Sequence, residues 1–512
     1  MAESQRESLI RSVDRRLAED PEFGNPQPIL KIVEERYHFG LELFAAHLPA
    51  VAELLRLVPG WPEGMRGELF FDPLVQFWME DAFERLERRE LRSPHPLEEL
   101  CGWALESLKA TGRLGLTEHE IGSSFRVGPQ RQIFLWDVKR SSHPLVQRLM
   151  KNFDGYFMEG TDAQATLCTP DPEMVHALDQ ALSVFADMLP HTATTVLSHT
   201  HSIALAIMRL GGARLLTGSA GDGLPGVILL SPEELRNPWD TAGHLLHEGL
   251  HTRFADISRF SALVARNADV DFPWREQEND FTVARALSAF HVYVHFVLYE
   301  AAVREYGHRV HGKYGPPGQH PVSAHAMSVV HVSGKGPFAT GMARCRYLGE
   351  QLATAWTPFL TPDGRRFVRW LLECLEPLGT EATAFMGALR ERERTEGLAS
   401  APEQVRPVSA GGAPPAPRSL RKNPRLQARP ITDAGYLLAF VPETPRVQLL
   451  NLHSWIISEL CDGRSQRAIG EQYHSIVGEA LPPEQVSAQL SAGLEQLEAC
   501  HIITSAPTAE GA

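Results

Sequence analysis

The sequence has few of the features that mark several large classes of protein. Six cysteines occur in 512 residues and no two form a Cys-x-x-Cys pair, which argues against a disulfide framework or a cysteine zinc site. The sequence contains no run of about 18 apolar residues, the length that a membrane-spanning helix needs. The polar N-terminus lacks the apolar segment of a secretion signal. The formal net charge of −14 disfavours broad nucleic-acid binding. We therefore expect a cytoplasmic globular protein that binds neither nucleic acid nor membrane.

The chain is too long for one typical core, and its composition predicts several domains. Residues 1–170 have mostly helical periodicity and are expected to pack with residues 171–397, which carry the candidate chemistry. Residues 398–430 are rich in proline, alanine and arginine, which predicts a linker. Residues 431–507 contain two strand-like runs followed by three helical ones, which predicts a winged-helix-like domain. The expected fold class is α+β, with a mainly helical catalytic domain and a small sheet.

The clearest chemical motif is His-Glu-x-x-His, formed by His247, Glu248 and His251. On a helix, residues four apart lie on one face, so both imidazoles can reach one metal ion. Glu248 beside them could orient or deprotonate a metal-bound water. His244 lies one turn earlier on the same side. The alternative is a helix that carries ordinary surface histidines.

The setting of the motif predicts a strand and a helix start before it. Residues 226–230 are an apolar strand-like run, and Ser231-Pro232 is typical of a helix N-terminus. A strand beside the metal helix could pair with an extended peptide, and we assign that role to 226–230. Residues 192–201 are rich in β-branched side chains and also predict a strand.

The C-terminal domain resembles the PqqD-like family, the peptide-recognition element of systems that modify ribosomally made peptides. The resemblance rests on residues 449–463, Ile469 and the closing apolar positions from Leu490 to Ile503. It implies that residues 431–507 bind the leader of a precursor peptide as an added strand. A DNA-binding winged helix is the alternative, but the recognition stretch lacks a basic stripe.

The catalytic half, roughly residues 175–375, resembles bacterial proteins with an HExxH motif found in ribosomal-peptide gene clusters. The matching pieces are 225–231, 247–251, 273–275, Arg285 with 289–291, and 360–364. The resemblance implies an Fe(II)- and 2-oxoglutarate-dependent dioxygenase that uses O2 to hydroxylate the β-carbon of a peptide side chain.

An iron centre of this kind needs three protein ligands on one face of the metal. His247 and His251 would be two of them. The resemblance points to His291, on a following long helix, as the third. Its rivals are Glu278, Asp280 and His295.

The resemblance also implies a cation for the distal carboxylate of 2-oxoglutarate. Arginine suits this role because its planar guanidinium pairs with a carboxylate through two hydrogen bonds. The candidates are Arg285 and Arg275, which follows Trp274. Alanine follows Arg285 where the family often has proline. Glu248 would then contact the metal ligands without binding the metal, or would act as the general base if the enzyme is hydrolytic.

The sequence thus predicts leader-guided β-hydroxylation of a precursor peptide. Two alternatives stay open: a zinc-dependent HExxH peptidase that processes the precursor, and a non-catalytic peptide-binding adaptor. Bound iron with formation of succinate would favour the first reading, and oxygen-independent cleavage that depends on Glu248 would favour the second.

Overall fold

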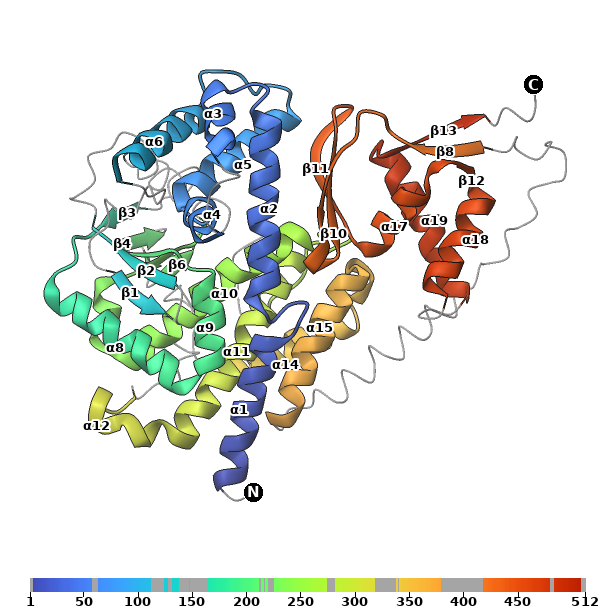
Figure 1. The fold of residues 1–512 in the computed structure, drawn as a ribbon. Coiled ribbons are helices and arrows are strands. Elements are labelled where there is room, and N and C mark those ends of the chain that lie inside the picture. The colour runs from blue at the N-terminus through green and yellow to red at the C-terminus, as the bar shows by residue number, and fades with distance from the viewer. Residues whose placement is uncertain are drawn as a thin grey trace. The chain divides into compact units, whose positions relative to one another are not determined.

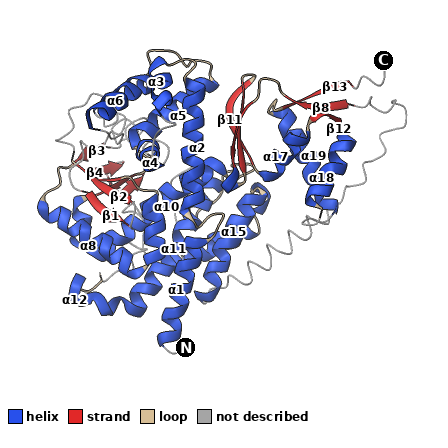
Figure 2. Ribbon diagram, viewed as in Figure 1, coloured by secondary structure: helices blue, strands red, loops and turns tan. Residues whose placement is uncertain are grey.

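Helices dominate the computed structural model and small sheets accompany them, which confirms the α+β class (Figure 2). The structure describes residues 3–57, 63–111, 124–127, 131–137, 147, 164–210, 213–215, 217–219, 225–273, 281–317, 338, 340–378, 418–478 and 483–507. The chain divides into two units. One contains residues 1–34, 56–78 and 96–389, and the other contains residues 35–55, 79–95 and 390–512.

The first unit holds the HExxH helix. Its helices are α1 (Glu3–Glu19), α4 (Glu63–Phe70), α6 (Pro96–Thr111), α8 (Pro172–Met188), α9 (Pro190–Ser198), α10 (Pro238–Phe260), α11 (Val283–Tyr306), α12 (His311–Tyr314), α14 (Gly341–Ala353) and α15 (Pro362–Leu375). Helices α2 (Pro26–Phe44), α3 (Pro49–Leu57) and α5 (Pro73–Glu87) have residues in both units (Figure 1).

The sheet of the first unit is mixed and seven-stranded. Its order is β1 (Ser124–Val127), β2 (Arg131–Trp136), β4 (Ser202–Leu210), β7 (Val227–Leu230) and β6 (Thr217–Ser219). Strands β3 (Gln164–Leu167) and β5 (Ala213–Leu215) also pair with β4. The β2–β4 and β4–β7 pairs are parallel, and the others are antiparallel.

Helix α10 begins at Pro238 and not at Ser231-Pro232, where the sequence predicts a helix start. Ser231-Pro232 opens only a short 3-10 turn over Pro232–Arg236. Asn237 then caps α10, because its side-chain oxygen accepts hydrogen bonds from the backbone N–H groups of Trp239 and Asp240. Pro238 occupies the first helical position, where no N–H is needed.

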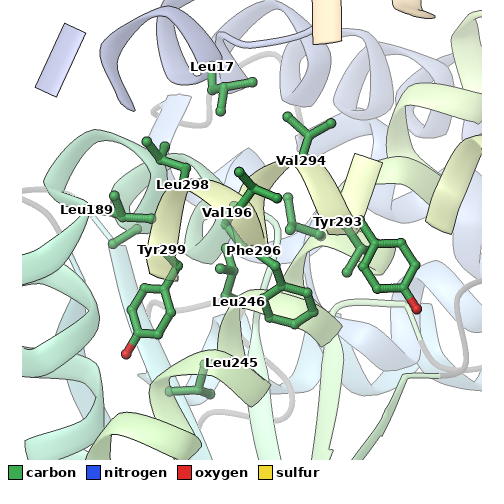
Figure 3. Packing of buried hydrophobic residues seen from close by; sticks show 14 of the residues in the cluster. Leu17, Leu189, Val196, Leu245, Leu246, Tyr293, Val294, Phe296, Leu298 and Tyr299 are labelled. Atoms are coloured by element: carbon green, nitrogen blue, oxygen red, sulfur yellow. The ribbon is translucent and has the colours of Figure 1, made fainter. Parts of the chain in front are cut away.

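A continuous apolar core joins α10 to its neighbours. Leu245, Leu246 and Leu250 of α10 are fully buried with Val196 of α9 and Phe296 of α11. Figure 3 shows part of this cluster. Packing against α9 and α11 therefore fixes the position of α10.

The strand predicted for residues 192–201 is wrong. The structure has the nine-residue helix α9 over Pro190–Ser198 instead. Pro190 at the first helical position favours the start, and buried Asp14 accepts hydrogen bonds from the N–H groups of His191 and Thr192. A cap from a residue far away in the sequence thus overrides the β preference of threonine and valine.

The second unit contains the tail domain. One antiparallel sheet has the order β11 (Thr444–Leu450), β10 (Tyr436–Val441), β9 (Gln427–Ile431), and another has the order β12 (Asp462–Ser465), β8 (Arg418–Lys422), β13 (Ile503–Pro507). The helices are α17 (Leu452–Leu460), α18 (Gln466–Val477) and α19 (Pro483–Ala499). The hairpin and the three helices are as expected from the sequence.

The predicted boundaries differ from the structure in two places. The linker prediction of 398–430 is wrong at its C-terminal end, because β8 and β9 occupy 418–431; residues 398–417 lie outside the described residues. Residues 35–55 and 79–95, predicted to belong with the catalytic region, group with the tail. Within this unit Arg429 of β9 pairs with Glu42 at 2.5 Å and with Glu35 at 3.4 Å.

One helical stretch of the described chain, Val283–Tyr314, is long and apolar enough to cross a membrane by length and composition alone. Its apolar window is 72% buried inside the structure. Burial in a protein core accounts for that composition.

Candidate metal centre on helix α10

His247 and His251 lie one turn apart on α10 and turn the same nitrogen toward each other. Their Nε2 atoms are 2.9 Å apart. With metal–nitrogen bonds of about 2.1 Å, two ligands at a right angle would be about 3.0 Å apart, and two at a tetrahedral angle about 3.4 Å. The pair therefore fits two neighbouring ligands of a metal with right-angled coordination. Without a metal, the same spacing holds one Nε2–H···Nε2 hydrogen bond.

The rest of the motif is buried beside this pair. Glu248 is 2% exposed, and its Oε1 lies 3.6 Å from Nδ1 of His247. His244 does not join the pair, because its Nε2 lies 3.0 Å from Oε2 of Glu234 in the preceding 3-10 turn. The structure thus separates a structural histidine from the two histidines whose Nε2 atoms meet.

Helix α11 supplies two neighbours that the sequence analysis missed. Nδ1 of His251 lies 2.9 Å from Oγ of Ser288. The ring of Phe296 packs on that of His247, with 5.7 Å between the ring centroids. The packing of α11 against α10 brings these residues together, and only their spacing of about two helical turns could have suggested a shared face.

His291 lies deeper between the helices, in an aromatic setting. It is fully buried, and its ring packs against Phe254, Phe367 and Trp370 at centroid distances of 6.2, 5.5 and 6.0 Å. Neither ring nitrogen has a hydrogen-bond partner among the described residues. Burial, followed by the nearby charges of His295 and Arg253, lowers the pKa of His291 well below its usual value. The ring is therefore neutral near pH 7.

No set of three His, Cys, Asp or Glu side chains within the described ranges is grouped closely enough to hold a metal. The structure brings His247 and His251 together but does not add His291 to them. His291 as third ligand stays a prediction, in which a metal would relieve one unsatisfied nitrogen. Of its rivals, His295 places Nδ1 2.8 Å from the carbonyl oxygen of His291. Glu278 and Asp280 lie outside the described residues.

Of the two arginines predicted to bind the carboxylate of 2-oxoglutarate, the described residues include Arg285. Arg285 is exposed in the first turn of α11, one turn before Ser288, and its guanidinium lies 5.9 Å from the ring centre of Phe281. Trp274 and Arg275 lie outside the described residues.

Behind the pair, buried charges hold α10 in place. Nδ1 of His199 lies 2.6 Å from Oδ2 of Asp256, which also pairs with Arg259. Arg253 is fully buried, and its Nη2 donates to the carbonyls of Leu17, Phe23 and Gly24. Burial lowers the pKa of Arg253 to about 9. These contacts explain why α10 presents its histidines in one orientation.

The predicted role of residues 226–230 in pairing with a peptide is wrong. Strand β7 pairs with β4 along Val227–Leu230 and with β6 along Ile228–Leu230, so both edges are occupied over Ile228–Leu230. An added peptide strand cannot hydrogen-bond to it.

Models of known protein families and curated proteins give no match to this chain.

Proposed function

We propose that this chain is an Fe(II)- and 2-oxoglutarate-dependent hydroxylase that acts in the cytoplasm on a ribosomally made precursor peptide. The observation that carries the proposal is the 2.9 Å approach of the Nε2 atoms of His247 and His251. That spacing suits a right-angled ligand pair, as in a centre with three protein ligands on one face. The bound iron would activate O2, which places one oxygen atom in a C–H bond and the other in succinate as 2-oxoglutarate loses CO2.

The residues around the pair have separate roles in this proposal. His247 and His251 hold the metal, and Phe296 keeps water from one side of His247. Arg285 lies one turn before Ser288, which touches His251, and we assign its guanidinium to the distal carboxylate of 2-oxoglutarate. Glu248 is buried behind His247 and orients it.

The tail is proposed to bind the leader as a PqqD-like recognition element. Strands β9 and β11 are the outer strands of their sheet, and an extended peptide can add to such an edge through backbone hydrogen bonds. Leu452 begins α17 directly after β11 and is 50% exposed. An exposed leucine beside an open strand edge suits an apolar leader side chain.

The test is mass spectrometry of a precursor peptide co-expressed with the full chain, together with assay of succinate. We expect a product one oxygen atom heavier, with that atom derived from labelled O2. His247→Ala and His251→Ala should abolish the product, whereas His308→Ala, which changes an exposed histidine, should not. Loss of iron from His291→Ala would support its role as third ligand. Iron-independent product would sink the proposal.

A zinc peptidase is the second candidate, favoured by Glu248 within an intact HExxH motif. Under strictly anaerobic conditions a peptidase would still cleave the precursor, and Glu248→Gln would stop it because the general base is lost. A hydroxylase would be inactive without O2. A non-catalytic adaptor would bind the precursor and take up no metal.

A further inference from the structure

We propose that Ser288 is the positioning residue of the metal centre: its hydroxyl oxygen accepts a hydrogen bond from Nδ1–H of His251 and leaves the lone pair of that ring on Nε2. The proposal rests on the proposed function in so far as His251 binds a metal. It adds a residue from a second helix whose part is to fix one imidazole.

The geometry that supports this role is local. Oγ of Ser288 is 2.9 Å from Nδ1 of His251, and Nε2 of the same ring points at Nε2 of His247. A neutral imidazole carries one proton, so a proton on Nδ1 frees Nε2 to bind metal. With the other tautomer the proton lies on Nε2 of His251 itself, and it has to leave that nitrogen before His251 can bind metal.

The placement of Ser288 makes its hydroxyl a fixed partner. Residues 283–306 form one helix packed along α10, and both flanks of Ser288 are held by buried neighbours such as Leu287 and Val292. The serine side chain and His251 are both half-buried, so water competes less for Nδ1 than it would at an exposed site. Outer partners of this kind orient ligand histidines, and their loss typically costs about 10- to 100-fold in metal affinity.

The experiment compares Ser288→Ala, Ser288→Thr and a control, Ser258→Ala, in the full-length chain. Ser258 is an exposed serine near the end of α10. Nitrogen-15 NMR of labelled histidines in metal-free protein, at mildly alkaline pH, reports which ring nitrogen of His251 carries the proton. Titration with Co(II) measures affinity at the same site.

We expect Ser288→Ala to shift His251 away from the Nδ1–H tautomer and to weaken Co(II) binding by about 10- to 100-fold. Ser288→Thr keeps the hydroxyl and should restore both properties, and Ser258→Ala should change neither. A merely structural serine would lower thermal stability without moving the tautomer.

An unchanged tautomer and unchanged Co(II) affinity in Ser288→Ala would overturn the inference. Failure of the proposed function is distinguishable, because a zinc peptidase would still bind Co(II) at His247 and His251 but form no hydroxylated product, and an adaptor would bind no metal there. The tautomer of His251 is measured without metal, so its dependence on Ser288 is decided in either case.

Discussion

Gly249, directly after Glu248, is a position where α10 cannot accept a larger side chain without a shift. A Cβ built there would lie 2.5 Å from Cγ1 of Val196 on α9, against the 3.4 Å at which ordinary contact begins. Val196 is β-branched and stiff, so its methyl group cannot swing aside. The two helices would have to separate.

The magnitude follows from two opposing effects. Alanine in place of glycine within a helix gains about 1 kcal/mol, while overpacking a well-filled core costs about 1–3 kcal/mol. We therefore expect Gly249→Ala to destabilise the protein by about 1 kcal/mol, a shift in Tm on the order of 2 °C in a unit of this size. Movement of α10 should also disturb His247 and His251 and weaken Co(II) binding.

Thermal unfolding with two companion variants checks this reasoning. Gly102→Ala is the matched control, because a Cβ at Gly102 on α6 meets no atom within 4 Å, and it should raise Tm. Val196→Ala combined with Gly249→Ala removes the clashing methyl group, so the double variant should lose about 1 kcal/mol less than the sum of the two single variants. If Gly249→Ala stabilises the protein as much as Gly102→Ala does, the close approach of α9 and α10 is refuted.

Two further predictions concern buried charges that anchor the same helices. Arg253→Met keeps the stem volume but removes the donor to three carbonyls, so we expect the free energy of unfolding to fall by about 3 kcal/mol. The control, Arg304→Met, changes an exposed arginine on α11 and should be nearly neutral. Equal Tm values for the two variants would contradict this expectation. Burial raises the pKa of Asp14, although hydrogen bonds from Thr192 oppose the shift. A raised folded pKa means that wild-type stability increases as pH falls through that pKa. Asp14→Asn has only one side-chain oxygen and therefore loses the hydrogen bond from either His191 or Thr192, but its stability relative to wild type should still fall on acidification, because only the wild type gains from protonation. Unfolding curves at several pH values test this, and a relative stability of the variant that rises on acidification would be against it.

The sequence predicted the parts of the fold that depend on local pattern. The helix through His247 and His251, the Val227–Leu230 strand and the order of the tail elements all follow from periodicity and turn residues. What it missed depends on partners distant in the sequence. Residues 192–198 are helical because Asp14 caps them, and residues 418–422 form a strand because β12 and β13 flank them.

The candidate site was predictable in the same uneven way. Two histidines four residues apart identify the pair, because the helix alone fixes their spacing. Ser288 and Phe296 could not be found, since their relevance depends on how α11 crosses α10. The sequence also did not predict that β7 lies inside the sheet. Its pairing with β6 depends on how two separate segments come together, which the pattern within β7 does not encode.

The geometry of α11 also bears on the two residues that resemblance assigned to it. At 3.6 residues per turn, Arg285 and Phe296 lie about 60° and 80° to one side of Ser288, and His291 about 60° to the other side. Phe296 touches His247, whereas His291 packs on Phe254, one turn beyond His251. Arg285 therefore shares the flank that faces the histidine pair. The proposed co-substrate role belongs to the flank of α11 that carries Ser288 and Phe296, whereas His291, the proposed third ligand, lies on the opposite flank in aromatic packing with Trp370.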